Sequence, residues 1–264
     1  MKNYLKDNTQ VREDILNQRL IFDLKEGSAL RKIHLKAFRS DVDIDGFDII
    51  LDNNDDLLLK CQVKSRFDST RAYFDIHRIM LKPNFYVFDT FEFNEPLGCP
   101  SDNRGVIQID GDVLNNKITT KYYYLDIYLL RAMELGIFKL TTQSKPKAEE
   151  TLNILRNDKG KSNDKIDVLQ SLFFPLKDAQ SLLAIMGFHS EHHGNLSHNI
   201  LEISKIISGR TDKRYEKLAD RIPDMKGHWD TINEELTKFI HPEHKFTKCN
   251  LNNNYFDKKE LNIP

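Results

Sequence analysis

Two short apolar segments joined by a polar turn set the frame for the rest of this chain. Residues 47–51 read Phe-Asp-Ile-Ile-Leu, and residues 57–64 read Leu-Leu-Leu-Lys-Cys-Gln-Val-Lys. The five residues between them, 52–56, are Asp-Asn-Asn-Asp-Asp, a composition typical of a turn. Apolar runs bounded by such residues predict two adjacent strands.

The polar residues of these two strands carry the chemistry. Asp48 stands at the start of the first strand, and Gln62 and Lys64 are two residues apart on the second. Side chains two apart on a strand project from the same face. If the strands pair, a carboxylate, an amide oxygen and an ammonium group converge. Such a cluster can hold a hard cation against a phosphate.

Composition limits the class of protein but does not identify a binding partner. The chain has 264 residues, 39% of them apolar and 30% charged, which suits one large globular domain or two smaller ones. The net charge of −1 gives no evidence for nucleic-acid binding, although a local basic groove can sit beside an acidic site. There is no signal peptide at the start and no long apolar run, and the three cysteines are far apart. We expect a cytoplasmic, reduced protein without a membrane segment.

The spacing of apolar residues predicts the other elements. Helices are expected over 9–26, 70–80, 122–138, 166–173, 178–186, 197–207, 214–222 and 230–240, and strands over 30–38, 47–51, 57–64, 85–93 and 106–109. Residues 1–140 then form an α/β domain, 141–165 a linker or exposed excursion, and 166–264 an all-α C-terminal domain.

The ordered set of residues points to a family. Gly46-Phe-Asp48 followed by Gln62-Val-Lys64-Ser-Arg66, with a helix before and after, resembles the Gly-x-Asp…Gln-x-Lys subgroup of the PD-(D/E)xK, or restriction-endonuclease-like, nucleases. The resemblance covers about residues 9–138. It implies an αβββαβ core with a mixed central sheet. It also implies a Mg²⁺-dependent endonuclease, with Mn²⁺ as a substitute, that cuts DNA in restriction or anti-phage defence.

The resemblance assigns roles at the metal. Asp48, the side-chain oxygen of Gln62 and the carbonyl of Val63 would ligate Mg²⁺, and Asp45 is the competing aspartate. Lys64 would orient or deprotonate the attacking water. Gln62 replaces the acid of many members, so the cage carries little charge.

Further residues are candidates with weaker patterns. The first-helix acid of the family falls on Glu13, with Asp14 as the other possibility. Contacts to substrate phosphate are expected from Ser65, Arg66, His77 and Arg78. The competing interpretation is that these are solvated strand ends and helix faces.

Several alternatives remain open on the sequence. The same site could cut RNA instead of DNA, or the domain could be a catalytically silent nucleic-acid-binding or regulatory module. A homodimer would suit two coordinated cuts. The histidine-rich run from His189 to His198 has spacings that could bind Zn²⁺, but a polar loop between helices explains it as well.

Overall fold

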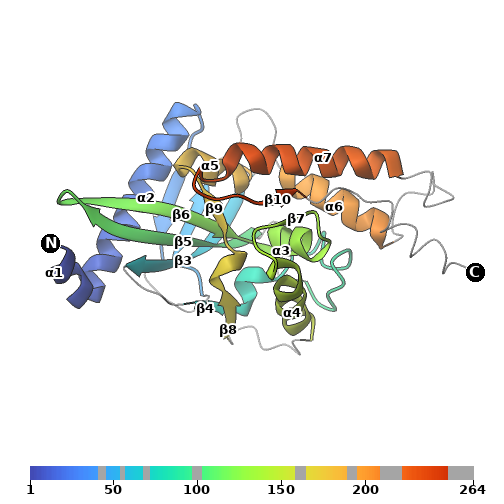
Figure 1. Cartoon of the computed structure of the whole chain (residues 1–264), viewed down its shortest axis with the longest axis horizontal. Coiled ribbons are helices and arrows are strands. Elements are labelled where there is room, and N and C mark those ends of the chain that lie inside the picture. The colour runs from blue at the N-terminus through green and yellow to red at the C-terminus, as the bar shows by residue number, and fades with distance from the viewer. Residues whose placement is uncertain are drawn as a thin grey trace, which may run out of the picture.

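The structure, a computed structural model, is built around a mixed sheet of six strands (Figure 1). It describes residues 1–40, 46–53, 57–67, 72–96, 103–157, 165–188, 195–208 and 222–248. The strand order is β1-β2-β3-β5-β6-β9, and helices surround the sheet. The prediction of an α/β fold with a mixed central sheet is therefore confirmed.

The predicted hairpin lies within the first three strands of this sheet. β2 pairs antiparallel with both β1 and β3, and Ile49 lies opposite Cys61. β5 then lies on the far side of β3 and runs parallel to it, whereas β6 and β9 are antiparallel to their neighbours. The strands of the sheet are β1 (Lys36–Arg39), β2 (Ile49–Asp52), β3 (Leu58–Phe67), β5 (Asn103–Leu114), β6 (Lys117–Leu125) and β9 (Phe174–Leu176).

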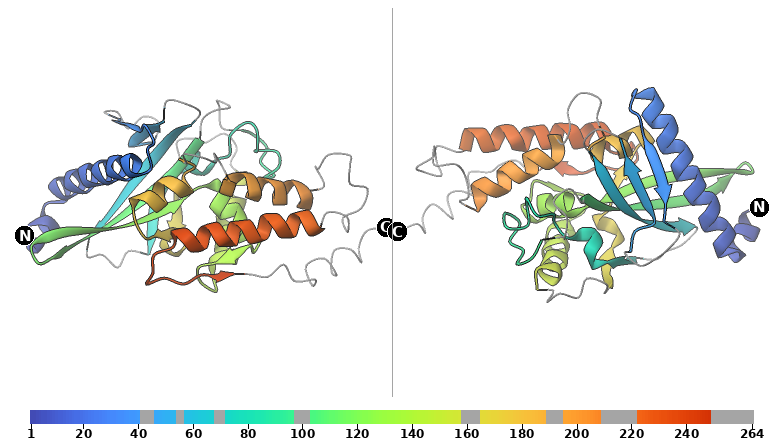
Figure 2. Two further views of the ribbon diagram at one scale, coloured as in Figure 1. Left: turned by 90° about the horizontal axis from the view of Figure 1, so that it is seen from above. Right: turned by 180° about the vertical axis from the view of Figure 1, so that it is seen from behind.

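The long helix α2 (Thr9–Leu30) covers one face of the sheet, as Figure 2 shows, and the short α1 (Lys2–Asp7) precedes it. Leu16, Leu20 and Leu24 recur every four residues and are completely or almost completely buried. A Cβ at Gly111 of β5 would lie 2.7 Å from Leu16 Cδ2, so the helix approaches the sheet closely there. The helix predicted over 9–26 is confirmed and is four residues longer.

Two segments predicted as helices form a separate pair of strands. β4 (Tyr73–His77) pairs antiparallel with β8 (Lys165–Leu169), and each continues into a 3₁₀ turn, η1 (Arg78–Leu81) and η2 (Gln170–Leu172). Both strands alternate between exposed and buried positions, which is the two-residue period of a half-buried strand. The helices predicted over 70–80 and 166–173 are therefore wrong.

The helix predicted over 122–138 is also wrong in its first part. Residues up to Leu125 belong to β6, which forms a hairpin with β5 through Asn115 and Asn116. Both asparagines have positive φ angles, 50° and 56°, as a two-residue hairpin turn requires. The helix α3 (Ile127–Glu134) begins only after Asp126, whose carboxylate accepts a hydrogen bond from the backbone N–H of Leu129 at 2.8 Å.

The strand predicted over 85–93 and the linker predicted over 141–165 need correction too. Residues 85–92 form turns, and the aromatic side chain of Phe91 is buried in the hydrophobic core. Residues 144–156 form the helix α4 (Ser144–Arg156). Arg156 on α4 pairs with Glu134 of α3 and donates to the backbone oxygen of Phe91 at 3.1 Å, so it joins three segments.

The C-terminal part shares its core with the rest. The predicted helices over 178–186, 197–207 and 230–240 are confirmed, whereas residues 209–221, where another was expected, lie outside the described residues. The prediction of an all-α region is wrong for residues 165–176, because β8 pairs with β4 and β9 pairs with β6. The remaining elements are α5 (Ala179–Ile185), α6 (Asn195–Ile207), α7 (Ile222–Phe239) and the pair β7 (Phe138–Lys139) and β10 (Thr247–Lys248). Buried side chains from Leu16 to Phe239 form one hydrophobic cluster.

Candidate functional site

The pairing of β2 with β3 places Asp48 beside the Gln-x-Lys segment. The backbone N–H of Asp48 donates to the carbonyl of Cys61 at 2.8 Å, which continues the pairing one residue beyond Ile49. The carboxylate of Asp48 accepts a hydrogen bond from the backbone N–H of Val63 at 2.5 Å. The carboxylate is therefore fixed at the edge of β3, next to Gln62 and Lys64.

The alternation of side chains along β3 decides which candidates share a face. Lys60, Gln62, Lys64 and Arg66 project to one side of the sheet, and Val63 and Ser65 to the other. Gln62 is buried, with 4% of its surface exposed, and Lys64 is half-buried. The structure therefore brings Asp48, Gln62 and Lys64 together, and it directs the side chain of Ser65 away from them.

His77 meets the same cluster from β4. Its backbone N–H donates to the side-chain oxygen of Gln62 at 3.2 Å, which also orients the amide. Gly46 lies directly against its side chain, because a Cβ at Gly46 would be 2.5 Å from His77 Cγ. Gly46 has a φ of +72°, so glycine is required there both for the backbone and for the contact. His77 thus lies at the site, but at the end of a strand instead of on the expected helix.

Arg66 is engaged by other side chains. Its guanidinium forms a bidentate ion pair with Asp110 of β5, with Nε 3.0 Å from Oδ1, and also donates to the side chain of Gln170. Gln108 donates to the same Oδ1 of Asp110 at 2.7 Å. β3 and β5 are in parallel register, with Lys64 opposite Gln108 and Arg66 opposite Asp110. Arg66 is therefore part of an internal polar row that continues the face of Lys64, and its expected contact with phosphate stays a prediction.

The first-helix acids lie elsewhere. Glu13 is exposed on α2, and this helix packs Leu16 against Gly111, on the face of the sheet opposite Lys64. Asp14 forms an ion pair with Arg39 of β1 at 3.0 Å. The next residue, Ser40, donates its N–H to the carbonyl of Asp48 at 2.9 Å. Of the two acids, Asp14 is therefore linked to the edge of the site through Arg39, and Glu13 is not.

The oxygen donors near Asp48 are of the kind that Mg²⁺ accepts. The carbonyl of Val63 points to the same strand edge as its N–H, and so toward Asp48, because both groups of one strand residue face one neighbour. The side-chain oxygen of Gln62 has a second lone pair beside the bond from His77. Within the described residues, no three His, Cys, Asp or Glu side chains form a group that could hold a metal. With Asp48 as its one carboxylate, this donor set could hold Mg²⁺ only weakly, with substrate oxygens completing the coordination.

Other expected ligands fall largely outside the structure's described part. Asp45 lies outside the described residues, as do residues 189–194 of the histidine-rich run. His198 of that run is on α6, with its ring centroid 6.3 Å from that of His228 on α7. Arg78 begins η1, directly after His77.

Sequence reasoning missed the partners that β5 and η2 supply. Gln108 and Asp110 are two residues apart on a strand, which is the same signal that identified Gln62 and Lys64. Their place beside β3 depends on a crossover of more than thirty residues, from 67 to 103, and so could not be predicted from spacing alone.

Comparison of the chain with protein-family models, with curated proteins and with solved structures gives no match. Among the described residues, no helix combines the length and the apolar character needed to cross a membrane.

Proposed function

We propose that this protein is a Mg²⁺-dependent nuclease of the PD-(D/E)xK type that hydrolyses phosphodiester bonds in DNA. The observation that carries the proposal is the contact between the Asp48 carboxylate and the N–H of Val63, beside Gln62 and Lys64 on one face. The strand arrangement supports it as well. A helix, an antiparallel β1-β2-β3 unit and a strand parallel to β3 match part of an αβββαβ core.

Each residue has a defined task in this proposal. Asp48, the amide oxygen of Gln62 and the carbonyl of Val63 hold Mg²⁺, and this ion supplies charge neutralisation and a more acidic water. Lys64 lies two residues from Gln62 on the same face, where its ammonium can orient the attacking water and stabilise charge on the phosphate. The backbone N–H of His77 donates to the side-chain oxygen of Gln62 and so fixes the orientation of this amide.

The crossover departs from the expected pattern. The segment between β3 and β5 contains β4 and η1 in place of the expected helix. β4 nevertheless places His77 against Gln62 and Gly46, beside the proposed metal ligands.

The direct test is cleavage of supercoiled plasmid and of total RNA by the purified protein. With Mg²⁺ or Mn²⁺ we expect nicked or linear plasmid, little change in RNA, and no cleavage in EDTA. Cleavage of RNA alone would show that the substrate is RNA, and it would leave the assignment of the site residues unchanged. Full cleavage in EDTA would exclude the proposed chemistry.

A second candidate is a catalytically silent nucleic-acid-binding module. It is favoured by Gln62, which is neutral, buried and already hydrogen-bonded to the backbone N–H of His77. This candidate predicts binding of DNA without cleavage, and no binding of Mn²⁺ at Asp48 when DNA is present. Titration of Mn²⁺ into the wild-type and Asp48→Asn proteins, each bound to a short duplex, separates the two functions.

A further inference from the structure

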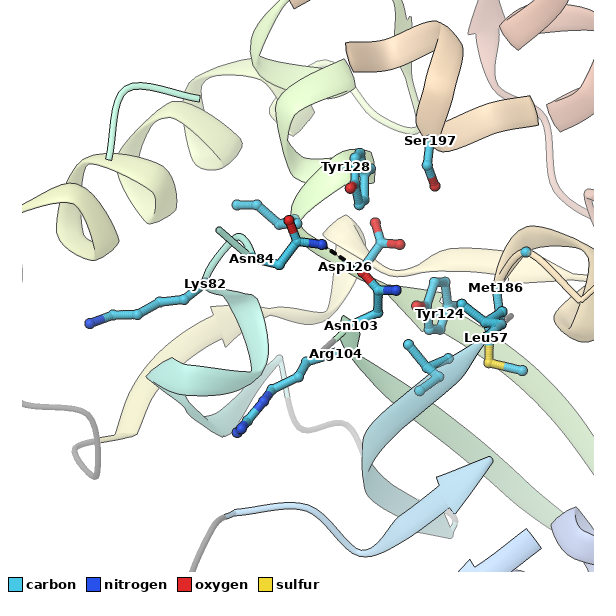
Figure 3. Close-up of a pocket in the computed structure, with 13 residues that line it drawn as sticks. Leu57, Lys82, Asn84, Asn103, Arg104, Tyr124, Asp126, Tyr128, Met186 and Ser197 are labelled. Carbon is cyan, nitrogen blue, oxygen red and sulfur yellow. Dashed lines mark hydrogen bonds between the residues drawn. The ribbon is translucent and has the colours of Figure 1, made fainter. Parts of the chain in front are cut away.

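A cavity lies at the end of the central sheet, where β3 and β5 begin and β6 ends (Figure 3). Its volume is about 220 Å³, and we call it the end pocket. None of Asp48, Gln62 and Lys64 lines it. The lining residues are Leu57, Leu59, Lys82, Asn84, Asn103, Arg104, Tyr124, Asp126, Ile127, Tyr128, Met186, Gly187 and Ser197.

Hydrogen bonds fix the orientation of a side-chain amide in the end pocket. The backbone N–H of Tyr86 can only donate, and it donates to Oδ1 of Asn84 at 3.0 Å. The Nδ2 group of Asn84 therefore donates, and its partner at 2.9 Å is Oδ1 of Asn103. The oxygen of Asn103 is thus the acceptor of this chain, and its NH₂ group is the donor presented to a ligand.

An acceptor lines the same pocket as that donor. Asp126 and Asn103 both line the end pocket, and in the view of Figure 3 the carboxylate of Asp126 and the amide of Asn103 fall in its central part. Asp126 is 7% exposed and also receives hydrogen bonds from the N–H of Leu129 and the hydroxyl of Tyr124. Burial raises the pKa of Asp126 to about 6, which leaves the carboxylate ionised at neutral pH. A buried carboxylate of this kind favours a ligand that brings a further donor.

The walls of the end pocket suit a flat ring. Leu57, Leu59, Ile127 and Met186 supply apolar side chains, and Tyr124 and Tyr128 supply aromatic ones. Charged side chains are distributed unevenly around the end pocket. Figure 3 shows the side chains of Lys82 and Arg104 running away from Asp126, so the cationic side of the pocket is opposite the carboxylate.

We propose that the end pocket binds the base of a nucleotide whose edge has an amino group beside a ring nitrogen, that is, adenine or cytosine. The ring nitrogen accepts from the NH₂ group of Asn103, and the amino group donates to Asp126. The phosphate lies toward Lys82 and Arg104. Uracil places a carbonyl oxygen against the Asp126 carboxylate and is rejected. The ligand is a free nucleotide or an unpaired base of a strand, and the inference does not depend on nuclease activity.

Binding of single nucleotides, without metal, tests the proposal by isothermal titration calorimetry. We expect AMP and CMP to bind at least about tenfold more tightly than UMP, which corresponds to one good base-edge contact. Short single strands of oligo(dA), oligo(dC) and oligo(dT) form the second arm. Selective binding of oligo(dA) and oligo(dC) without binding of AMP or CMP identifies a strand as the source of the base.

Two variants place the binding in the end pocket. Asn103→Leu removes the donor at similar volume, and Ser197→Trp fills the pocket from α6. Both should lose the preference for AMP and CMP. Their controls are Asn153→Leu on the exposed surface of α4 and His198→Trp, the exposed neighbour of Ser197. If Asn103→Leu does not fold, Ser197→Trp still decides.

Three results would overturn the proposal: equal affinity for all the nucleotides, no binding of any nucleotide or strand, or binding that both variants leave intact. Because these measurements contain no Mg²⁺ and follow no cleavage, their failure leaves the proposed nuclease untouched. Conversely, an absence of cleavage leaves the base-binding result standing.

Discussion

The two candidate sites of this molecule are built in opposite ways. The Asp48 site takes its central residues from one hairpin within residues 46–64, with His77 added from the next strand. The end pocket takes its residues from segments between Leu57 and Ser197. The first site is set by local pairing and the second by the packing of the whole chain. A change in one should therefore leave the other's function intact, and this separation can be tested.

The largest effect is expected on cleavage. Lys64→Ala should lower the rate of plasmid cleavage by about 100-fold or more, as loss of a residue that assists proton transfer does. The matched control is Lys60→Ala, which removes the same charge from the same face of β3 two positions before Gln62. Rates are compared by gel assay in Mg²⁺, with the fold checked by circular dichroism. Similar rates for the two variants would remove Lys64 from the proposed chemistry.

Asp126, in the end pocket, should make the stability of the protein depend on pH. Its pKa is about 6 in the folded protein and near 3.8 when unfolded, so the folded state binds the proton more tightly. This contribution to stability is complete below about pH 4 and is lost as the pH rises through 6. Over that window it amounts to at most about 3 kcal/mol.

The Asp126→Asn variant keeps an acceptor for the N–H of Leu129 and removes the titration. Its free energy of unfolding, minus that of the wild type, should rise from pH 4 to pH 7 in urea denaturation. Asp178→Asn at the exposed N-cap of α5 measures the effect of changing a cap residue alone. A difference for Asp126→Asn that stays constant with pH would contradict the buried carboxylate described for the end pocket.

Substitution of Gly46, in the turn before Asp48, should lower stability more than substitution of a glycine elsewhere. Gly46→Ala forces a side chain into a φ of +72° and against His77, and we expect a loss of at least about 2 kcal/mol in stability. Gly227 lies in α7, and apart from the backbone of its own helix turn and its two chain neighbours nothing lies within 4 Å of its Cβ position. Gly227→Ala should therefore stabilise the protein by about 0.5–1 kcal/mol. Urea denaturation of both variants checks the contrast, and equal effects would contradict the contact between Gly46 and His77.

The same difference between local and distant contacts explains what the sequence could predict. The paired strands around Asp48 and the helix with Leu16, Leu20 and Leu24 follow from patterns within a few residues, and both were found. β4 and β8 were missed because each is five residues long and its partner is about ninety residues away. Arg66 looked like a free cation for the same reason, since Asp110 and Gln170 reach it only in the folded chain.

The β5–β6 hairpin was not predicted, although its turn carries a local sequence signal. The smallest change in stability that we predict concerns this turn. Asn115-Asn116 between β-branched and aromatic residues is a two-residue turn with both φ angles positive. Glycine is the preferred second residue of such a turn, so Asn116→Gly should raise stability by roughly 0.5 kcal/mol. Asn153→Gly on the exposed face of α4 should lower it by roughly 0.3 kcal/mol, because glycine is the poorer helix former. A loss of stability in Asn116→Gly, measured beside that control by urea denaturation, would mean that the turn is not the local, sequence-encoded element that its φ angles indicate.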